Sequence, residues 1–101
     1  MKDAVLLVGA GPMSVEYFKV LEMFEKPCIV LGRGEKSANN FKEETGKTVI
    51  RKKVGEYIAE NDTPELAIVA VGEASLGSVT KELIMHGVKK ILVEKKEEVI
   101  S

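Results

Sequence analysis

Short apolar runs alternate with longer amphipathic stretches along this 101-residue chain. The runs are Ala4–Val8, Cys28–Leu31, Thr48–Ile50, Leu66–Val71 and Ile91–Val93. All but the third are nearly free of polar residues, which is typical of strands that helices cover on both faces. The alternation therefore predicts repeated strand–helix units around a parallel sheet.

The stretches between these runs carry apolar residues at the spacing of helices with one buried face. A helix over residues 12–24 and another over 37–45 are expected, followed by a short helix near residues 54–58 and a longer one from Leu76. The residues expected to face the core are Tyr17, Phe18, Leu21 and Phe24 in the first helix, Ala38 and Phe41 in the second, Val54, Tyr57 and Ile58 in the third, and Leu76, Val79, Leu83 and Ile84 in the fourth.

Glycines and one serine mark the expected helix ends. Gly46 and Gly87 suit left-handed turns after the second and fourth helices, and Ser75 is the expected cap of the fourth. Because strand–helix–strand crossovers are right-handed, we predict a three-layer, doubly wound α/β fold. The expected sheet has five parallel strands in the order 3-2-1-4-5, with helices on both faces, and residues 1–101 form a single domain.

Composition narrows the range of functions. Apolar residues make up 45% of the chain and charged residues 31%, with a formal charge of −1, so a globular protein is expected and nucleic acid is not an expected partner. The chain lacks an apolar run long enough for a membrane helix, and its single cysteine, Cys28, fits a reducing, cytoplasmic location and a buried structural role. No His/Cys/Asp/Glu group has the spacing of metal ligands, and His86 is expected to cap a helix.

A glycine-rich segment, Gly-Ala-Gly-Pro-Met-Ser at residues 9–14, joins the first expected strand to the first helix. The first glycine permits a tight turn, the second lets a pyrophosphate approach the backbone, and the helix N-terminus attracts the negative charge. The small Ser14 stands where a third glycine usually allows close helix–strand packing. We therefore predict a dinucleotide-binding domain of the Rossmann type, with Gly9, Gly11, Pro12 and Met13 at the phosphates.

The end of the second strand is expected to select the nucleotide, because NAD sites usually place an acidic residue there. Here Gly32-Arg33 follows the strand, and a guanidinium can grip the 2′-phosphate of NADP. Lys36 and Ser37 can add to this anion site, so NADP is preferred. Glu35 could instead face the ribose and restore NAD binding, and Arg33 could simply be solvated. The basic run at residues 51–53 lies near a possible adenosine edge, but it is best interpreted as solvated charge.

The segment Ile91-Leu92-Val93-Glu94-Lys95 resembles the strand and Glu-Lys-Pro signature of Gfo/Idh/MocA oxidoreductases, and residues 67–87 are similar in length and pattern. The resemblance implies the cofactor-binding half of an NAD(P)-dependent enzyme that acts on sugars or polyols. The family's second domain, which holds most substrate contacts, is not expected within these 101 residues. Lys96 replaces the signature proline, and the stretch after Val71-Gly72 lacks the family's frequent Thr-Pro pair and nearby histidine.

On this resemblance, Lys95 would lie near the nicotinamide as a catalytic residue, with Glu94 orienting the site. Gly72 and Val71 would approach the cofactor after the fourth strand. A small-molecule substrate would bind only with a second domain, so little or no turnover is expected from this chain alone, and homo-oligomerisation is left open. Two alternatives remain: a stand-alone nucleotide-sensing regulatory module, or a scaffold that binds nothing tightly.

Overall fold

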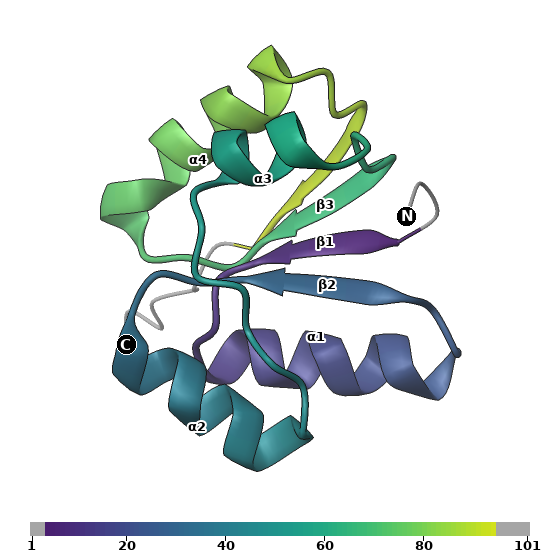
Figure 1. The fold of residues 1–101 in the computed structure, drawn as a ribbon, viewed down its shortest axis with the longest axis vertical. Coiled ribbons are helices and arrows are strands. Elements are labelled where there is room, and N and C mark those ends of the chain that lie inside the picture. The colour runs from purple at the N-terminus through teal and green to yellow at the C-terminus, as the bar shows by residue number, and fades with distance from the viewer. Residues whose placement is uncertain (1–3, 95–101) are drawn as a thin grey trace, which may run out of the picture.

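Four parallel strands form the centre of the molecule and four helices cover the two faces of the sheet (Figure 1) in the computed structural model, which describes residues 4–94. The helices and strands alternate along the chain as the sequence pattern indicates, apart from one place where two helices follow each other. In order, they are β1 (Val5–Val8), α1 (Pro12–Met23), β2 (Cys28–Leu31), α2 (Glu35–Thr45), α3 (Val54–Glu60), β3 (Leu66–Val69), α4 (Glu73–Met85) and β4 (Lys90–Val93).

The strand order in the sheet is β2-β1-β3-β4, and every neighbouring pair is parallel. Helices α1 and α2 lie on one face, and α3 and α4 lie on the other (Figure 1). The chain therefore winds outward from β1 in both directions. Because all the strands are parallel, their carboxyl ends lie at one edge of the sheet.

Alternate residues of the central strand β1 enter two separate cores. Val5 and Leu7 pack with Phe18 and Phe41 beneath α1 and α2. Their neighbours Leu6 and Val8 pack on the opposite face with residues of α3 and α4. Because both faces of the strand are buried, every position in it must be apolar, which explains the continuous apolar run in the sequence. An edge-to-face contact between the rings of Phe18 and Phe41, with centroids 5.5 Å apart, links α1 to α2.

The predicted five-stranded sheet is wrong in its number of strands. The predicted third strand, residues 48–50, is reduced to a single bridge between Ile50 and Leu31, on the outer side of β2. The Ile50 N–H donates to the Val30 carbonyl at 2.8 Å, and the Gly32 N–H donates to the Ile50 carbonyl at 3.1 Å. The segment is only three residues long, begins with the exposed, polar Thr48 and is followed by an exposed basic run, so it pairs at the expected place without forming a strand.

Three details at the helix ends also differ from expectation. Gly72, not Ser75, is the N-cap of α4, because the helix begins two residues before Ser75. The side chains of Phe24 and Ile84 are 76% and 62% exposed, so neither faces the core. Phe24 lies just beyond the last residue of α1, where the chain leaves the helix. By contrast, the expected left-handed turns are present at Gly46, with φ 78°, and at Gly87, with φ 86°.

Cys28 is buried at the start of β2, and this burial raises the pKa of its thiol to about 11. A thiol with so high a pKa is almost entirely protonated at neutral pH, which fits the structural role expected for it. Within residues 4–94, no helix has both the length and the apolar character needed to cross a membrane.

Candidate functional site

A cleft of about 560 Å³ opens at the carboxyl ends of the central strands. It lies where β1, between β2 and β3, sends the chain to one face of the sheet and β3 sends it to the other. Loops diverge at such a switch point, and this divergence leaves room for a ligand in open α/β sheets. The path of the backbone alone therefore creates the cleft.

The turn after β1 forms the floor of this cleft. Gly9 is buried with a φ of 116°, and its N–H donates to the Leu31 carbonyl at 2.7 Å. A Cβ on Gly9 would lie 2.2 Å from the Ala70 carbonyl oxygen, so only glycine fits there. At Gly11, by contrast, no described atom outside the adjoining backbone lies within 4 Å of the place where a Cβ would stand. The first glycine therefore serves the fold, and the second leaves free space in the cleft.

Three of the helices that begin at the cleft have a glycine as their N-cap. Gly11, Gly34 and Gly72 precede α1, α2 and α4, and all three line the cleft. Within the described part of the chain, no side chain caps any of these helices. The first N–H groups of a helix have no partners inside it, and the helix dipole makes its N-terminus positive. The cleft thus collects three uncapped helix N-termini, an arrangement that favours an anion.

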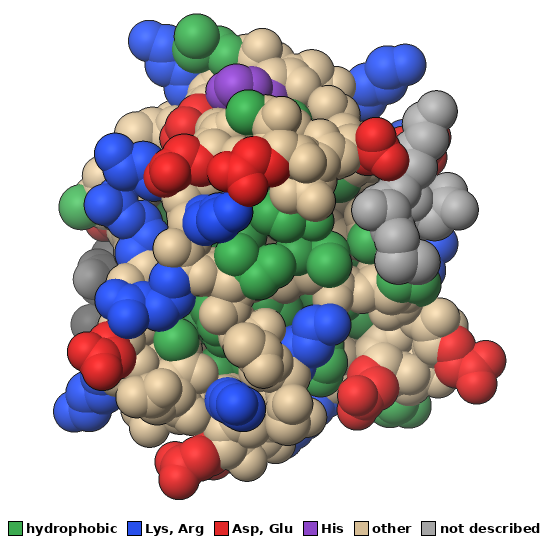
Figure 2. Space-filling model, in the orientation of Figure 1, with side chains coloured by type: hydrophobic (Ala, Val, Ile, Leu, Met, Phe, Trp, Pro, Cys, Tyr) green, Lys and Arg blue, Asp and Glu red, His purple; other side chains and the backbone are tan. Residues whose placement is uncertain are grey.

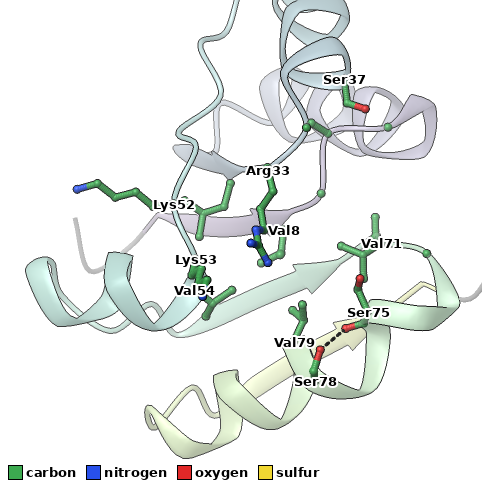
Figure 3. A pocket seen from close by; sticks show the side chains of 18 of the residues that line it. Val8, Arg33, Ser37, Lys52, Lys53, Val54, Val71, Ser75, Ser78 and Val79 are labelled. Atoms are coloured by element: carbon green, nitrogen blue, oxygen red, sulfur yellow. Dashed lines mark hydrogen bonds between the residues drawn. The ribbon is translucent and has the colours of Figure 1, made fainter.

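Basic side chains border the cleft on the side of β2. Arg33, Lys52 and Lys53 line it, and Figure 3 shows the Arg33 side chain extending into it while Lys52 points away. The Arg51 side chain donates to the Arg33 carbonyl at 3.2 Å, which ties together the loops after β2 and after Ile50. Figure 2 shows Lys and Arg side chains gathered on the left of the view, the side toward which the strands run in Figure 1.

Only one of these lysines has an acidic partner among the described residues. The Lys52 ammonium lies 2.7 Å from a carboxylate oxygen of Glu60, and this hydrogen bond raises the pKa of Lys52. Both side chains are exposed, so the pair contributes little to stability. Arg33 and Lys53 remain available to a ligand.

The opposite wall of the cleft comes from α3, the end of β3 and α4. Val54, Val71 and Val79 give it an apolar surface, and Figure 3 shows all three around the same space as Arg33. Polar groups lie on α4 beside them. The Ser78 hydroxyl donates to the Ser75 carbonyl at 3.1 Å, and Glu82 accepts a hydrogen bond from the Gly55 N–H at 3.0 Å.

Six of the residues predicted for the site come together in this cleft, and the others lie elsewhere. Pro12 lines a groove between α1 and α2, and Lys36 lines a separate groove with Glu35. Met13 follows Pro12 in the first turn of α1 and does not line the cleft. Lys95 lies outside the described residues. Those that share the cleft are Gly9, Gly11, Arg33, Ser37, Val71 and Gly72.

Glu94 lies at the end of β4, outside the cleft lining. Its N–H donates to the Val69 carbonyl at 2.9 Å, and its carboxylate accepts a hydrogen bond from the Tyr17 hydroxyl of α1. That hydrogen bond is the main reason why the pKa of Tyr17 is raised, with desolvation and the negative charge of Glu94 adding to it. The pair holds the end of β4 against α1.

The sequence interpretation missed the polar wall of α4. Ser75, Ser78 and Glu82 are spaced i, i+3 and i+7, so they share one helix face next to the apolar residues of the same helix. In the sequence alone, this spacing of polar residues looks the same as that of an ordinary solvated helix face. Only the fold shows that the face lies beside the carboxyl ends of the strands. Lys53 belongs to the basic run at residues 51–53, which was interpreted as solvated charge, and the structure places it in the cleft lining.

Two solved structures are similar in fold to this chain. GenD2 from gentamicin A biosynthesis, solved in complex with NAD, has a TM-score of 0.70 and 27% identity, over 91% of this chain and 26% of GenD2. BF3122 from Bacteroides fragilis, described as an NADP oxidoreductase, has a TM-score of 0.63 and 19% identity, over 91% of this chain and 35% of that protein. The sequence matches no family model and no curated protein.

These likenesses establish a Rossmann-like fold. The chain spans about a quarter of GenD2 and about a third of BF3122. The fold expected from the alternating sequence pattern is therefore confirmed, with four strands among the described residues in place of the predicted five.

Proposed function

We propose that this chain is the cofactor-binding part of an NAD(P)-dependent oxidoreductase and that it prefers NADP. The observation that carries the proposal is the convergence of three uncapped helix N-termini, at Gly11, Gly34 and Gly72, on one cleft at the switch point of the sheet. The names of GenD2, solved with NAD, and of BF3122 support the same class of cofactor.

A pyrophosphate fits the residues present. Space is open beside the backbone of Gly11 and of Gly72, where side chains would otherwise obstruct an approaching phosphate. The first turn of α1 leaves the N–H groups of Met13 and Ser14 without helical partners, so Met13 would contribute through its backbone. Pro12 has no N–H and only sets the start of the helix. The bound dinucleotide would supply the hydride.

The preference for NADP rests on the charges at the end of β2. No acidic residue follows this strand directly, and the Arg33 side chain extends into the cleft. Glu35, which could have faced a ribose, lines the separate groove with Lys36. A guanidinium forms strong paired hydrogen bonds to phosphate, so Arg33 would hold the 2′-phosphate, with Ser37 and Lys53 beside it.

The finer part of the proposal is membership in the Gfo/Idh/MocA family, with a sugar or polyol as substrate. It is supported by the signature-like segment at residues 91–95. On this proposal Lys95 would act on the substrate and Glu94 would help to orient the loop. A second domain would provide most substrate contacts, so the purified chain is expected to bind cofactor with little or no turnover.

The test is a fluorescence titration of the wild type and Arg33→Ala with NADPH and with NADH. Charge-assisted hydrogen bonds contribute about 1.5–3 kcal/mol, so we expect Arg33→Ala to weaken NADPH binding by about tenfold to a hundredfold. The affinity for NADH should stay within about twofold, because NADH lacks the 2′-phosphate. Equal wild-type affinities for the two would contradict the NADP preference. No binding of either would contradict the proposed function.

A further inference from the structure

A carboxylate lies at the end of the cleft where α3 meets α4. Glu82 is the only acidic residue among the described residues that line the cleft. Its Oε1 accepts a hydrogen bond from the Gly55 N–H at 3.0 Å, which fixes the position of the carboxylate. A Cβ on Gly55 would lie 2.5 Å from that oxygen, so the glycine allows this close approach.

The inference rests on the proposed function, because only a bound dinucleotide gives the position of Glu82 a meaning. If the pyrophosphate lies at Gly11 and the 2′-phosphate lies at Arg33, the base on the same ribose must extend beyond Arg33. There the cleft is bounded by Val54 of α3 and Val79 of α4 (Figure 3). Aliphatic walls of this kind suit the flat apolar faces of a purine. Glu82 follows Val79 by three residues and therefore lies at the edge of this space.

Glu82 is half-buried and keeps one carboxylate oxygen toward the proposed cofactor, where a hydrogen-bond donor on the ligand would stabilise it. The Gly55 N–H donates to Oε1 of Glu82, and among the described residues no hydrogen bond to its other oxygen is formed. The His86 Nε2 is also near this point, 3.0 Å from the place where a Cβ on Gly55 would stand. A carboxylate only accepts hydrogen bonds. Adenine presents an exocyclic amine, which donates, whereas hypoxanthine carries a carbonyl oxygen at the same ring position. The free oxygen would attract the first group and repel the second.

We propose that Glu82 is a specificity-determining residue that selects adenine through its exocyclic amine. A purely structural role, as a link between α3 and α4, would also explain the bond to Gly55. Glu82→Gln separates the two roles, because its amide oxygen can still accept from Gly55 while its amide nitrogen becomes a donor. The link between the helices is thereby kept, and the group facing the base is reversed.

The experiment measures the Kd of NADPH and of its hypoxanthine analogue, deamino-NADPH, for the wild type, Glu82→Gln and Glu22→Gln. Glu22 lies on α1, away from the cleft lining, and is the matched control. A hydrogen bond to a charged group is strong, so we expect the wild type to prefer NADPH by about tenfold or more. The ratio should fall below about threefold, or reverse, in Glu82→Gln, and should not change in Glu22→Gln.

The wild-type ratio tests the inference even if Glu82→Gln does not fold. Equal binding of both nucleotides by the wild type would overturn it, and so would an unchanged ratio in a folded Glu82→Gln. Either result leaves NADP binding itself intact. Failure of both nucleotides to bind the wild type would instead contradict the proposed function.

Discussion

Two regions lie at the same cleft: the glycine turn after β1, and the basic border formed by Arg33, Lys52 and Lys53. Different interactions fix the two regions in place. The turn is fixed by packing, because Gly9 is pressed against the Ala70 carbonyl and hydrogen-bonded to Leu31. The border consists of exposed side chains, of which Arg33 is tied only through its backbone, to Arg51. The backbone of the first region is therefore part of the core, and the side chains of the second are not.

The two regions therefore have different effects on binding. The turn determines which class of ligand binds, and the border determines which member of that class is preferred. The turn and the helix N-termini present backbone groups, which favour any phosphate and cannot distinguish one dinucleotide from another. Exposed charged side chains change without disturbing the core, so they can adjust specificity at little cost in stability. Substitutions in the turn should consequently affect folding or all nucleotides together, whereas substitutions in the border should affect only the phosphorylated form.

The largest effect is expected from Gly9→Ala. The new Cβ would overlap the Ala70 carbonyl oxygen at a positive φ, so both overpacking and backbone strain would destabilise the fold. Each contributes about 1–3 kcal/mol, and we expect the free energy of unfolding to fall by about 3 kcal/mol in urea denaturation. An unchanged midpoint would show that the turn is not packed as described.

Gly11→Ala is the matched control for that substitution. Its Cβ would enter open space, so the loss of stability should not exceed about 1 kcal/mol, the usual range for an N-cap change to alanine. The same methyl group would occupy the proposed path of the pyrophosphate. NADPH and NADH should both bind at least about tenfold more weakly, and binding equal to wild type would exclude a phosphate at Gly11.

The smallest effect is expected from Lys53→Met. Lys53 lines the cleft beside Arg33, and the two also share a neighbouring groove of about 360 Å³ with Arg51 and Lys52. A solvated lysine near a phosphate contributes modestly, so NADPH binding should weaken by about threefold at low salt, with NADH unaffected. In titrations at two salt concentrations, Lys36→Met should have no effect. A larger loss of NADPH affinity in Lys36→Met than in Lys53→Met would instead support the sequence prediction that Lys36 serves the anion site.

Most of the fold could be predicted from the sequence because both faces of the central strands are buried. Continuous apolar runs located β1, β2 and β3, and Gly46 and Gly87 marked helix ends that the structure retains. The third predicted strand failed because a three-residue run gives enough apolar surface to pair once but too few residues to extend a ladder. The hydrophobic pattern of a segment does not determine how many of its residues pair with a neighbouring strand.

The site was predictable where it depends on the backbone and less so where it depends on long side chains. Gly11 and Gly72 follow directly from their positions after strands, and the structure places both at the cleft. Lys36 was predicted for the cleft by proximity in sequence to Arg33, but helix α2 carries it to another groove. Glu82 could not be predicted for the site because it is distant in sequence from the glycine turn and from Arg33. It lines the cleft only because α3 and α4 pack together.

We expect a nicotinamide dinucleotide phosphate to bind where the three glycine-capped helix N-termini converge. The most direct measurement is the change in backbone amide NMR shifts of the 101-residue chain on titration with NADPH. The largest shift changes that saturate with NADPH should occur at the starts of α1, α2 and α4, around Gly11, Gly34 and Gly72, and at Arg33. Saturating changes confined to other surfaces, or none at millimolar NADPH, would contradict it.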